Sequence, residues 1–445
     1  MRLAEPRPSP GWSGTHLLRA LRSRNYRLYF FGQGVSLVGT WMTTIATSWL
    51  VYRLSGSVIL LGIVGFSGQI PAFLFAPFAG VFVDRWNRHR LLVVTQVLAM
   101  LQSLALAFLA LTGIITIGQI IALSIVQGVI NACDIPARQA FLVEMVEGPE
   151  DLGNAIALNS SIFNGARLVG PSIAGVLIAG AGEGICFLVD GVSYLAVIAA
   201  LCAMRLAPER RQPAPLPLLR QLREGMAYAY GFAPIKAILA LTALTSLVGI
   251  PYAVLMPVFA RDILHGGPHT FGFLMAASGL GALVGAIYLA SRRSVLGLGR
   301  VITLATSLFG CSLISFALSR VLWVSFLLML GVGCGMLVQM AASNTILQTL
   351  VDEDKRGRIM SFYAMAFMGM MPFGSLLAGG LASRLGAPTT LLIGGAACLV
   401  GAFVFSRQLP RLRAIIRPLY VKKGILPEVA TGIQAAVNLL VPPEE

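Results

Sequence analysis

Three ionisable side chains lie inside long apolar runs of the sequence, and they are the first candidates for chemistry. Asp134 lies near the end of one run, Arg167 in the middle of the next and Asp190 early in the one after. A charge in hydrocarbon is costly unless it is paired or hydrated, so such residues often mark ion or substrate pathways. We expect Asp134 and Asp190 to be the carboxylates that take up protons. An Arg167–Asp190 pair, or a purely structural role for either residue, is the alternative.

A second group of charges crowds between two charge-free runs. The segment GVFVDRWNRHR, residues 80–90, carries Asp84, Arg85, Arg88 and Arg90 in a chain that is only 11% charged. Basic residues at the ends of membrane spans are retained on the cytoplasmic side. The segment therefore predicts a short cytoplasmic loop, and fixing the orientation is its minimal role.

The composition places the chain in a lipid bilayer. Its 445 residues are 57% hydrophobic and include 48 glycines, which exceeds what a water-soluble core of this size can bury. The formal charge of +15 is spread singly between apolar spans, so we expect no nucleic-acid partner. All six cysteines lie in apolar segments without CxxC spacing, so we expect neither disulfides nor a metal site.

Enzymatic activity has little support in the sequence. The four histidines are His16, His89, His265 and His269, and none lies within a span beside a Ser or Cys nucleophile. The chain has no GxxxxGK[ST] loop that would hold a nucleotide phosphate. We therefore expect no enzyme and no cofactor, with a proton gradient as the energy source.

Twelve apolar runs are long enough to cross a membrane, which takes about 20 residues of helix. They lie near 28–52, 57–83, 91–112, 115–136, 152–180, 184–204, 237–260, 270–291, 301–319, 321–350, 359–383 and 386–406. We expect an all-α membrane protein with twelve transmembrane helices in two pseudo-symmetric six-helix bundles. Its parts are a cytoplasmic N-terminal segment 1–27, an N-terminal bundle 28–204, a cytoplasmic linker 205–235, a C-terminal bundle 236–406 and a cytoplasmic basic and amphipathic tail 407–445.

Short matches between the two halves indicate a duplicated unit. The sequence SLVG occurs at 36–39 and again at 246–249, Gly62 matches Gly272, and the segment around Pro171 matches that around Pro372. The matches keep their order at a nearly constant spacing. Many secondary transporters are built from such repeats, with the substrate site between the two units.

Polar side chains recur at helical spacing on the first, fourth, seventh and tenth spans, which are equivalent members of repeated triplets. Unpaired polar groups are costly in hydrocarbon, so these stripes point into the bundle or a water-filled cavity. Hydrogen bonding between helices without a cavity is the alternative. The substrate-cavity candidates are Gln33, Trp41, Thr44, Gln127, Asn131, Tyr252, Gln339, Met340 and Asn344.

Over nearly its whole length the sequence resembles the Major Facilitator Superfamily. Residues 80–90 are similar to its signature G-x-x-x-D-R-x-G-R-R/K between the second and third helices. Gly80, Asp84, Arg85 and Arg88 match it, Asn87 replaces the second glycine, and Arg90 follows one residue after the last basic position. Gly170 and Pro171 lie in a run that resembles the fifth-helix motif of its exporters, which are often proton antiporters. Segments 136–140, 187–195 and 355–361 resemble the enterobactin-exporter-like branch, whose members export siderophores, macrolides and other drugs.

The resemblance implies a gate on the cytoplasmic side. It places Asp84 against the start of the eleventh span and Arg88 against an acid near the end of the fourth, where Asp134 is the only acid in the span. We hypothesise that an Asp84/Arg88/Asp134 latch closes this side in the outward-facing state. The expected gating residues are Gly80, Asp84, Arg85, Arg88, Arg90, Asp134, Gly170 and Pro171.

Together, the residues and the resemblance predict a secondary active transporter. We expect it to export a bulky amphipathic small molecule, a siderophore or drug, by alternating access in exchange for protons. An importer or facilitator of a small nutrient, or a lipid-moving or sensory membrane protein of the same fold, is the alternative. We expect a monomer in the bacterial inner membrane, with both termini cytoplasmic and the lipid bilayer as its surroundings.

Overall fold

A computed structural model of the chain describes residues 18–146, 148–205, 231–292 and 294–422. The backbone of residues 76–85 belongs to a described helix, whereas their side chains lie outside the description. The predicted contact of Asp84, the gating role of Arg85 and the features of the tail beyond residue 422 therefore stay predictions.

The first half is a bundle of helices joined by short loops. These helices are α1 Arg24–Ser55, α2 Val58–Arg85, α3 Arg88–Leu111, α4 Ile117–Phe141, α5 Pro149–Ala181 and α6 Glu183–Cys202. The loops are short because the residues that end one helix and the capping residues that begin the next lie close together in the sequence. Asn87 Oδ1 accepts from Arg90 N at 3.0 Å at the start of α3, and Thr116 and Gln119 form a capping box on α4. Gly182, with φ of 82°, ends α5.

The second half repeats this pattern with two broken helices. Its helices are α8 Ala233–Leu244, α9 Tyr252–Val258, α10 Pro268–Ser291, α11 Leu298–Leu318, α12 Leu322–Leu350, α13 Glu353–Phe367, α14 Met371–Leu385 and α15 Ala387–Lys422. We expected one continuous seventh span, but π-helical turns, η4 at Thr245–Gly249 and η5 at Phe259–Ile263, interrupt it. Pro251, which lies between η4 and α9, cannot donate a backbone hydrogen bond, which accounts for the break there.

The all-α membrane class is confirmed. Eleven segments of the described residues are long and apolar enough to cross a membrane. Helix α1, with 32 residues, is long enough to be the twelfth, and its polar stripe explains why it is less apolar. The predicted end of the last helix, near residue 406, differs from the structure. Helix α15 continues through Arg407 to Lys422.

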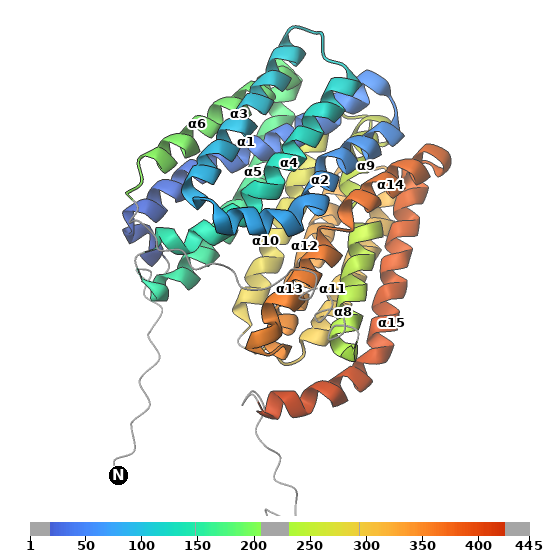
Figure 1. Cartoon of the computed structure of the whole chain (residues 1–445). Coiled ribbons are helices and arrows are strands. Elements are labelled where there is room, and N and C mark those ends of the chain that lie inside the picture. Colours follow the sequence, from blue (N-terminus) through green and yellow to red (C-terminus); the bar gives the residue numbers. More distant parts are fainter. Residues whose placement is uncertain (1–17, 147, 206–230, 293, 423–445) are drawn as a thin grey trace, which may run out of the picture.

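Three hydrophobic cores show how the halves meet. The shared core contains residues of both halves, including Trp49, Leu61, Phe271 and Leu391. The first-half core, around Tyr26 and Phe141, and the second-half core, around Ile238 and Ile346, each contain one half only. The two separate cores lie toward the end of the molecule where α1 starts and α15 ends, which we call the terminal side (Figure 1). The halves are thus joined by apolar packing on the side opposite the terminal side.

Candidate functional site

Two helix pairs bring the halves together, and glycines let their backbones touch. Helix α5 packs on α10, and α2 packs on α14. A Cβ atom added at Gly272 of α10 would lie 2.3 Å from the carbonyl oxygen of Pro171. One added at Gly62 of α2 would lie 2.7 Å from the carbonyl oxygen of Ser375. Backbone atoms cannot move aside as side chains can, so only glycine fits at these two crossings.

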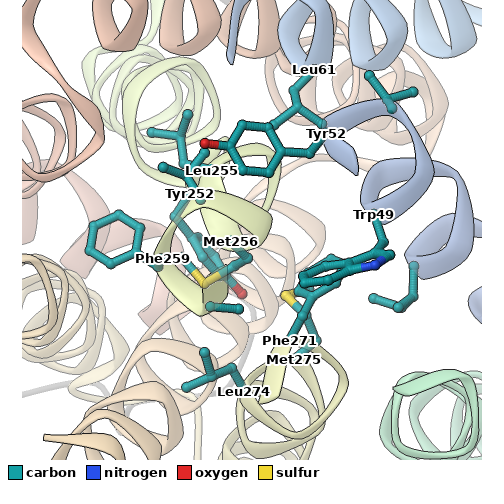
Figure 2. Packing of buried hydrophobic residues seen from close by; sticks show 14 of the residues in the cluster. Trp49, Tyr52, Leu61, Tyr252, Leu255, Met256, Phe259, Phe271, Leu274 and Met275 are labelled. Atoms are coloured by element: carbon teal, nitrogen blue, oxygen red, sulfur yellow. The ribbon is translucent and has the colours of Figure 1, made fainter. Parts of the chain in front are cut away.

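Aromatic and charged side chains complete the seal on this side. The rings of Trp49 and Phe271 stack across the two halves with centroids 6.3 Å apart. The Tyr52 hydroxyl of α1 donates to the carboxylate of Asp262 in the second half, and the Arg261 guanidinium lies 5.8 Å from the Tyr52 ring centre. Figure 2 shows Trp49 and Tyr52 facing the buried side chains of the second half. Neither Asp262 nor Arg261 is among the candidate residues predicted from the sequence, so the sequence did not predict this contact.

Arg167 lies where the shared core meets the middle of the bundle. Its guanidinium is 5.9 Å from the Trp41 ring of α1, and its Nη2 atom is 4.0 Å from Met336 Sδ on α12. Trp41 also meets Phe163 edge to face, with ring centroids 5.8 Å apart. Within the described residues, no ion pair includes Arg167. A half-buried cation therefore contacts aromatic and thioether groups from both halves.

The alternative Arg167–Asp190 pair does not form, because Asp190 faces the interior of the first half. Its Oδ2 atom accepts hydrogen bonds from Thr43 Oγ1 of α1 and Ser103 Oγ of α3, each at 2.8 Å. The side chain is buried, and Oδ1 has no hydrogen-bond partner among the described residues. The donors to this carboxyl are thus neutral hydroxyl groups.

Asp134 has a different environment, although it is equally buried. Its Oδ1 atom accepts from Thr95 Oγ1 at 2.8 Å and from Gln96 Nε2 at 2.6 Å. Its Oδ2 atom accepts from Arg138, one turn further along α4. The four-residue spacing of these two residues is the signal that could have predicted this pair. Asp134 is a charge-compensated carboxylate.

The hypothesised Arg88–Asp134 contact is not formed in this conformation, and its formation in the outward-facing state stays a prediction. Arg88 Nη1 donates to Glu144 Oε1 at 2.7 Å, and Glu144 lies in a 3-10 turn after α4. Arg88 begins α3, so it lies at the level of the turn that follows α4, whereas Asp134 lies inside α4. Gly80, Asp84 and Arg85 belong to residues 76–85, whose side chains lie outside the description. The Arg90 side chain is exposed.

The polar stripes divide into buried and partly open positions. Gln33, Tyr252 and Gln339 are buried, so they do not face an open cavity in this conformation. The Tyr252 hydroxyl is instead 2.7 Å from the Ser278 hydroxyl. Thr44 is exposed, and the partly exposed candidates are Trp41, Gln127, Asn131, Met340 and Asn344.

These partly exposed polar groups also bond within their own helices. Gln127 Nε2 donates to Asn131 Oδ1 at 3.1 Å, and Gln348 Nε2 donates to Asn344 Oδ1 at 2.5 Å. Gly170, one of the expected gating residues, packs on α1, where an added Cβ would lie 2.6 Å from Trp41 Cβ. Among the described residues, no group of three or more His, Cys, Asp or Glu side chains could hold a metal ion.

Two six-helix halves, joined on one side and separate on the other, define a membrane transporter of the Major Facilitator Superfamily. The model of the transmembrane secretion effector family (MFS_3) matches residues 15–419, so the chain belongs to this family. The chain is therefore a multi-pass membrane transporter and not an enzyme.

Curated relatives cover most of the chain. The Staphyloferrin A transporter of Staphylococcus aureus is 27% identical over 406 residues, 86% of this chain and 97% of that protein. The Multidrug efflux pump Tap of Mycolicibacterium fortuitum is 27% identical over 404 residues, 87% of this chain and 96% of that protein. Macrolide efflux protein A of Streptococcus pyogenes is 22% identical over 396 residues, 85% and 96% of the two chains.

Solved structures share the fold. A bacterial homologue of the iron transporter ferroportin in an inward-facing state has a TM-score of 0.66 at 16% identity, covering 86% of this chain and 98% of that one. A D-xylose-proton symporter has a TM-score of 0.67 at 12% identity, covering 85% and 96%. At this identity the likeness concerns the fold alone.

Proposed function

We propose that this efflux-family transporter exports an amphipathic small molecule that carries an anionic group, in exchange for protons and by alternating access. The observation that carries the proposal is Arg167, a half-buried cation that touches Trp41 of its own half and Met336 of the other half. A ligand at this place would contact both halves, so its binding would depend on how the halves are arranged.

The division of the hydrophobic cores supports alternating access. Apolar packing joins the halves on one side only, so this conformation is open toward the terminal side. The loop with Arg88 and Arg90 lies there, and basic loops are retained in the cytoplasm. The terminal side is therefore the cytoplasmic side, and the described conformation is the one that takes up a substrate from the cell. The outward-facing state would require the Gly272 and Gly62 crossings to separate.

The surroundings of Arg167 favour a particular class of substrate. An unpaired guanidinium in a membrane protein attracts a carboxylate or a phosphate, to which it can donate two parallel hydrogen bonds. Trp41 and Phe163 supply flat apolar surface, and Met336 supplies a flexible one. The relatives that transport a siderophore or macrolides support a bulky substrate.

The two buried carboxylates have different roles in this proposal. Asp134 is compensated by Arg138, so it serves the structure of the first half. Asp190 accepts only from hydroxyls, so an ionised carboxylate there would leave a buried charge without a compensating cation. Asp190 is therefore the candidate that carries the exchanged proton.

Substrate accumulation in cells tests the proposal. Cells with and without the protein are loaded with a carboxylate-bearing siderophore or with a macrolide that has no carboxylate, and each measurement is repeated with a protonophore. Lower accumulation in cells with the protein, reversed by the protonophore, is the expected result. Higher accumulation in these cells would establish import and overturn the proposal. Efflux that is unaffected by the protonophore would overturn the proton exchange.

A further inference from the structure

A second site lies on the terminal side of the second half, away from Arg167. A pocket of about 350 Å³ is enclosed by α8, the start of α11, α12 and the last part of α15. Its walls include Ile238, Leu298 and Leu412, and three arginines, Arg300, Arg413 and Arg417, also line it. Ligand pockets range from about 300 to 1,000 Å³, so this one has room for a headgroup and its glycerol but not for a whole lipid.

The last part of α15 forms one wall of this pocket outside the bilayer core. The helix has 36 residues, which at 1.5 Å per residue is about 54 Å, whereas the hydrocarbon core of a bilayer is about 30 Å thick. Figure 1 shows the dark red end of α15 turning and passing below the other helices of the second half. Pro410 and Pro418 lie inside the helix and account for a bend.

Close packing holds this bent segment against α11. A Cβ atom added at Gly299 would lie 2.6 Å from Leu409 Cδ1. Leu412 and Tyr420 are buried, whereas Arg413 and Arg417 of the same segment are exposed. The segment therefore packs its apolar face on the second-half core, and its arginines stand at the mouth of the pocket.

The charge around the pocket is uniformly positive. None of its described lining residues is acidic, and no ion pair between described residues uses Arg300, Arg413 or Arg417. Three cations beside an apolar pocket at the membrane surface complement a group with an anionic head and apolar chains. A soluble anion would satisfy the arginines and leave the apolar walls without a partner.

We propose that this pocket binds the phosphate headgroup of an anionic phospholipid. The arginines hold the phosphate, the pocket takes the glycerol region, and the acyl chains leave toward the bilayer. Bound lipid stabilises the bent end of α15 against α8 and α11. The site is separate from the proposed substrate site, because neither Arg167 nor Met336 is among its lining residues.

Thermal unfolding of the purified full-length protein tests this site. Phosphatidylglycerol, phosphatidylcholine or inorganic phosphate is titrated into the detergent-solubilised wild type, the double variant Arg413→Gln/Arg417→Gln and a matched control, Arg407→Gln/Arg411→Gln. The control removes the same charge from the same helix at positions that do not line the pocket. Native mass spectrometry of the same samples counts the bound lipids.

Phosphatidylglycerol is expected to raise the melting temperature of the wild type and of the control, and phosphatidylcholine and inorganic phosphate are not. The pocket variant should need roughly 30-fold more phosphatidylglycerol for the same effect, because it lacks two basic side chains and each one near an anionic membrane surface contributes about 1 kcal/mol. An equal response of pocket variant and control would overturn the site. An equal response to inorganic phosphate would show a soluble-anion site and overturn the lipid.

Discussion

Two contacts between helices occupy equivalent places in the repeated unit, at Gly39 in the first half and at Gly249 in the second. We call these contacts seams, and they differ in the side chains that pack there. In the first half, a Cβ added at Gly39 of α1 would lie 2.6 Å from both Asp190 Oδ1 and Ser193 Oγ on α6. In the second half, a Cβ added at Gly249 would lie 2.4 Å from Phe309 Cε1 and 3.0 Å from Cys398 Sγ. The first seam is polar and holds a carboxyl group, whereas the second is apolar.

The same asymmetry extends through the two halves. Among the described residues, the buried acids are Asp134, Glu183 and Asp190, and all three belong to the first half. The duplicated fold is nearly symmetric, yet within the described residues its buried carboxyl groups are confined to one copy. A transporter needs only one proton carrier for each cycle. The second half can therefore have apolar side chains where the first half has buried charged ones, and the two halves can still move relative to each other.

The largest expected effect concerns the compensated pair of the first half. Asp134→Ala leaves Arg138 with neither its carboxylate nor full hydration, which should cost roughly 2–3 kcal/mol, less than for a fully buried pair because 23% of the Arg138 side chain is exposed. The matched change in the second half is Ser343→Ala, since Ser343 Oγ is buried without a hydrogen-bond partner among the described residues. This second change should be neutral. Melting temperatures measure both effects. An equal decrease in melting temperature for the two variants would contradict the difference between the two halves.

The next effect concerns the crossing between α5 and α10. Gly272→Val places atoms within 2.3 Å of the Pro171 carbonyl oxygen, and overpacking of about 1–3 kcal/mol should shift the equilibrium toward the outward-facing state by roughly 5- to 150-fold. Gly180→Val on α5 is the control, because an added Cβ there meets no atom within 4 Å. Distances between spin labels on the terminal side of the two halves report the shift, and unchanged distances in the Gly272 variant would contradict it.

A smaller effect is expected at Arg167. Arg167→Gln keeps a polar group beside Trp41 but removes the charge, so the KM of a carboxylate-bearing substrate should rise about tenfold. This rise corresponds to the lower limit for a hydrogen bond to a charged group, because the site is half-exposed. The KM of the same substrate with its carboxylate esterified should be the same in wild type and variant. Equal changes for both substrates would indicate a structural role and contradict substrate recognition.

The smallest effect is expected at the seal. Tyr52→Phe keeps the ring against Arg261 and removes the hydrogen bond to Asp262. The loss of about 0.5–1.5 kcal/mol should open the sealed side a few-fold more often. The rate of labelling of a cysteine introduced near this seal measures the opening, and an unchanged rate would show that the tyrosine hydroxyl does not hold the halves together.

Much of the architecture could be predicted from the sequence, because the length of apolar runs and the positions of basic loops determine a membrane bundle directly. The partners of individual charges could not. Glu144 lies beyond the apolar run of the fourth span, so a search within that span pointed Arg88 to Asp134 instead. The Tyr52–Asp262 bond joins residues 210 positions apart, and only the packing of the halves brings them together. Pro251 and Pro257 were visible in the sequence and could have indicated the broken seventh span, but a continuous helix was expected there.

Proton-driven transport by the Asp190→Asn variant tests the central claim most directly. The variant keeps a group of nearly the same shape between Thr43 and Ser103 but cannot exchange a proton. Wild type and variant are reconstituted in liposomes, and substrate accumulation driven by an imposed pH gradient is compared with exchange of labelled for unlabelled substrate at equal pH. We predict that the variant keeps the exchange and loses the gradient-driven accumulation. The same accumulation ratio in both proteins would contradict the account.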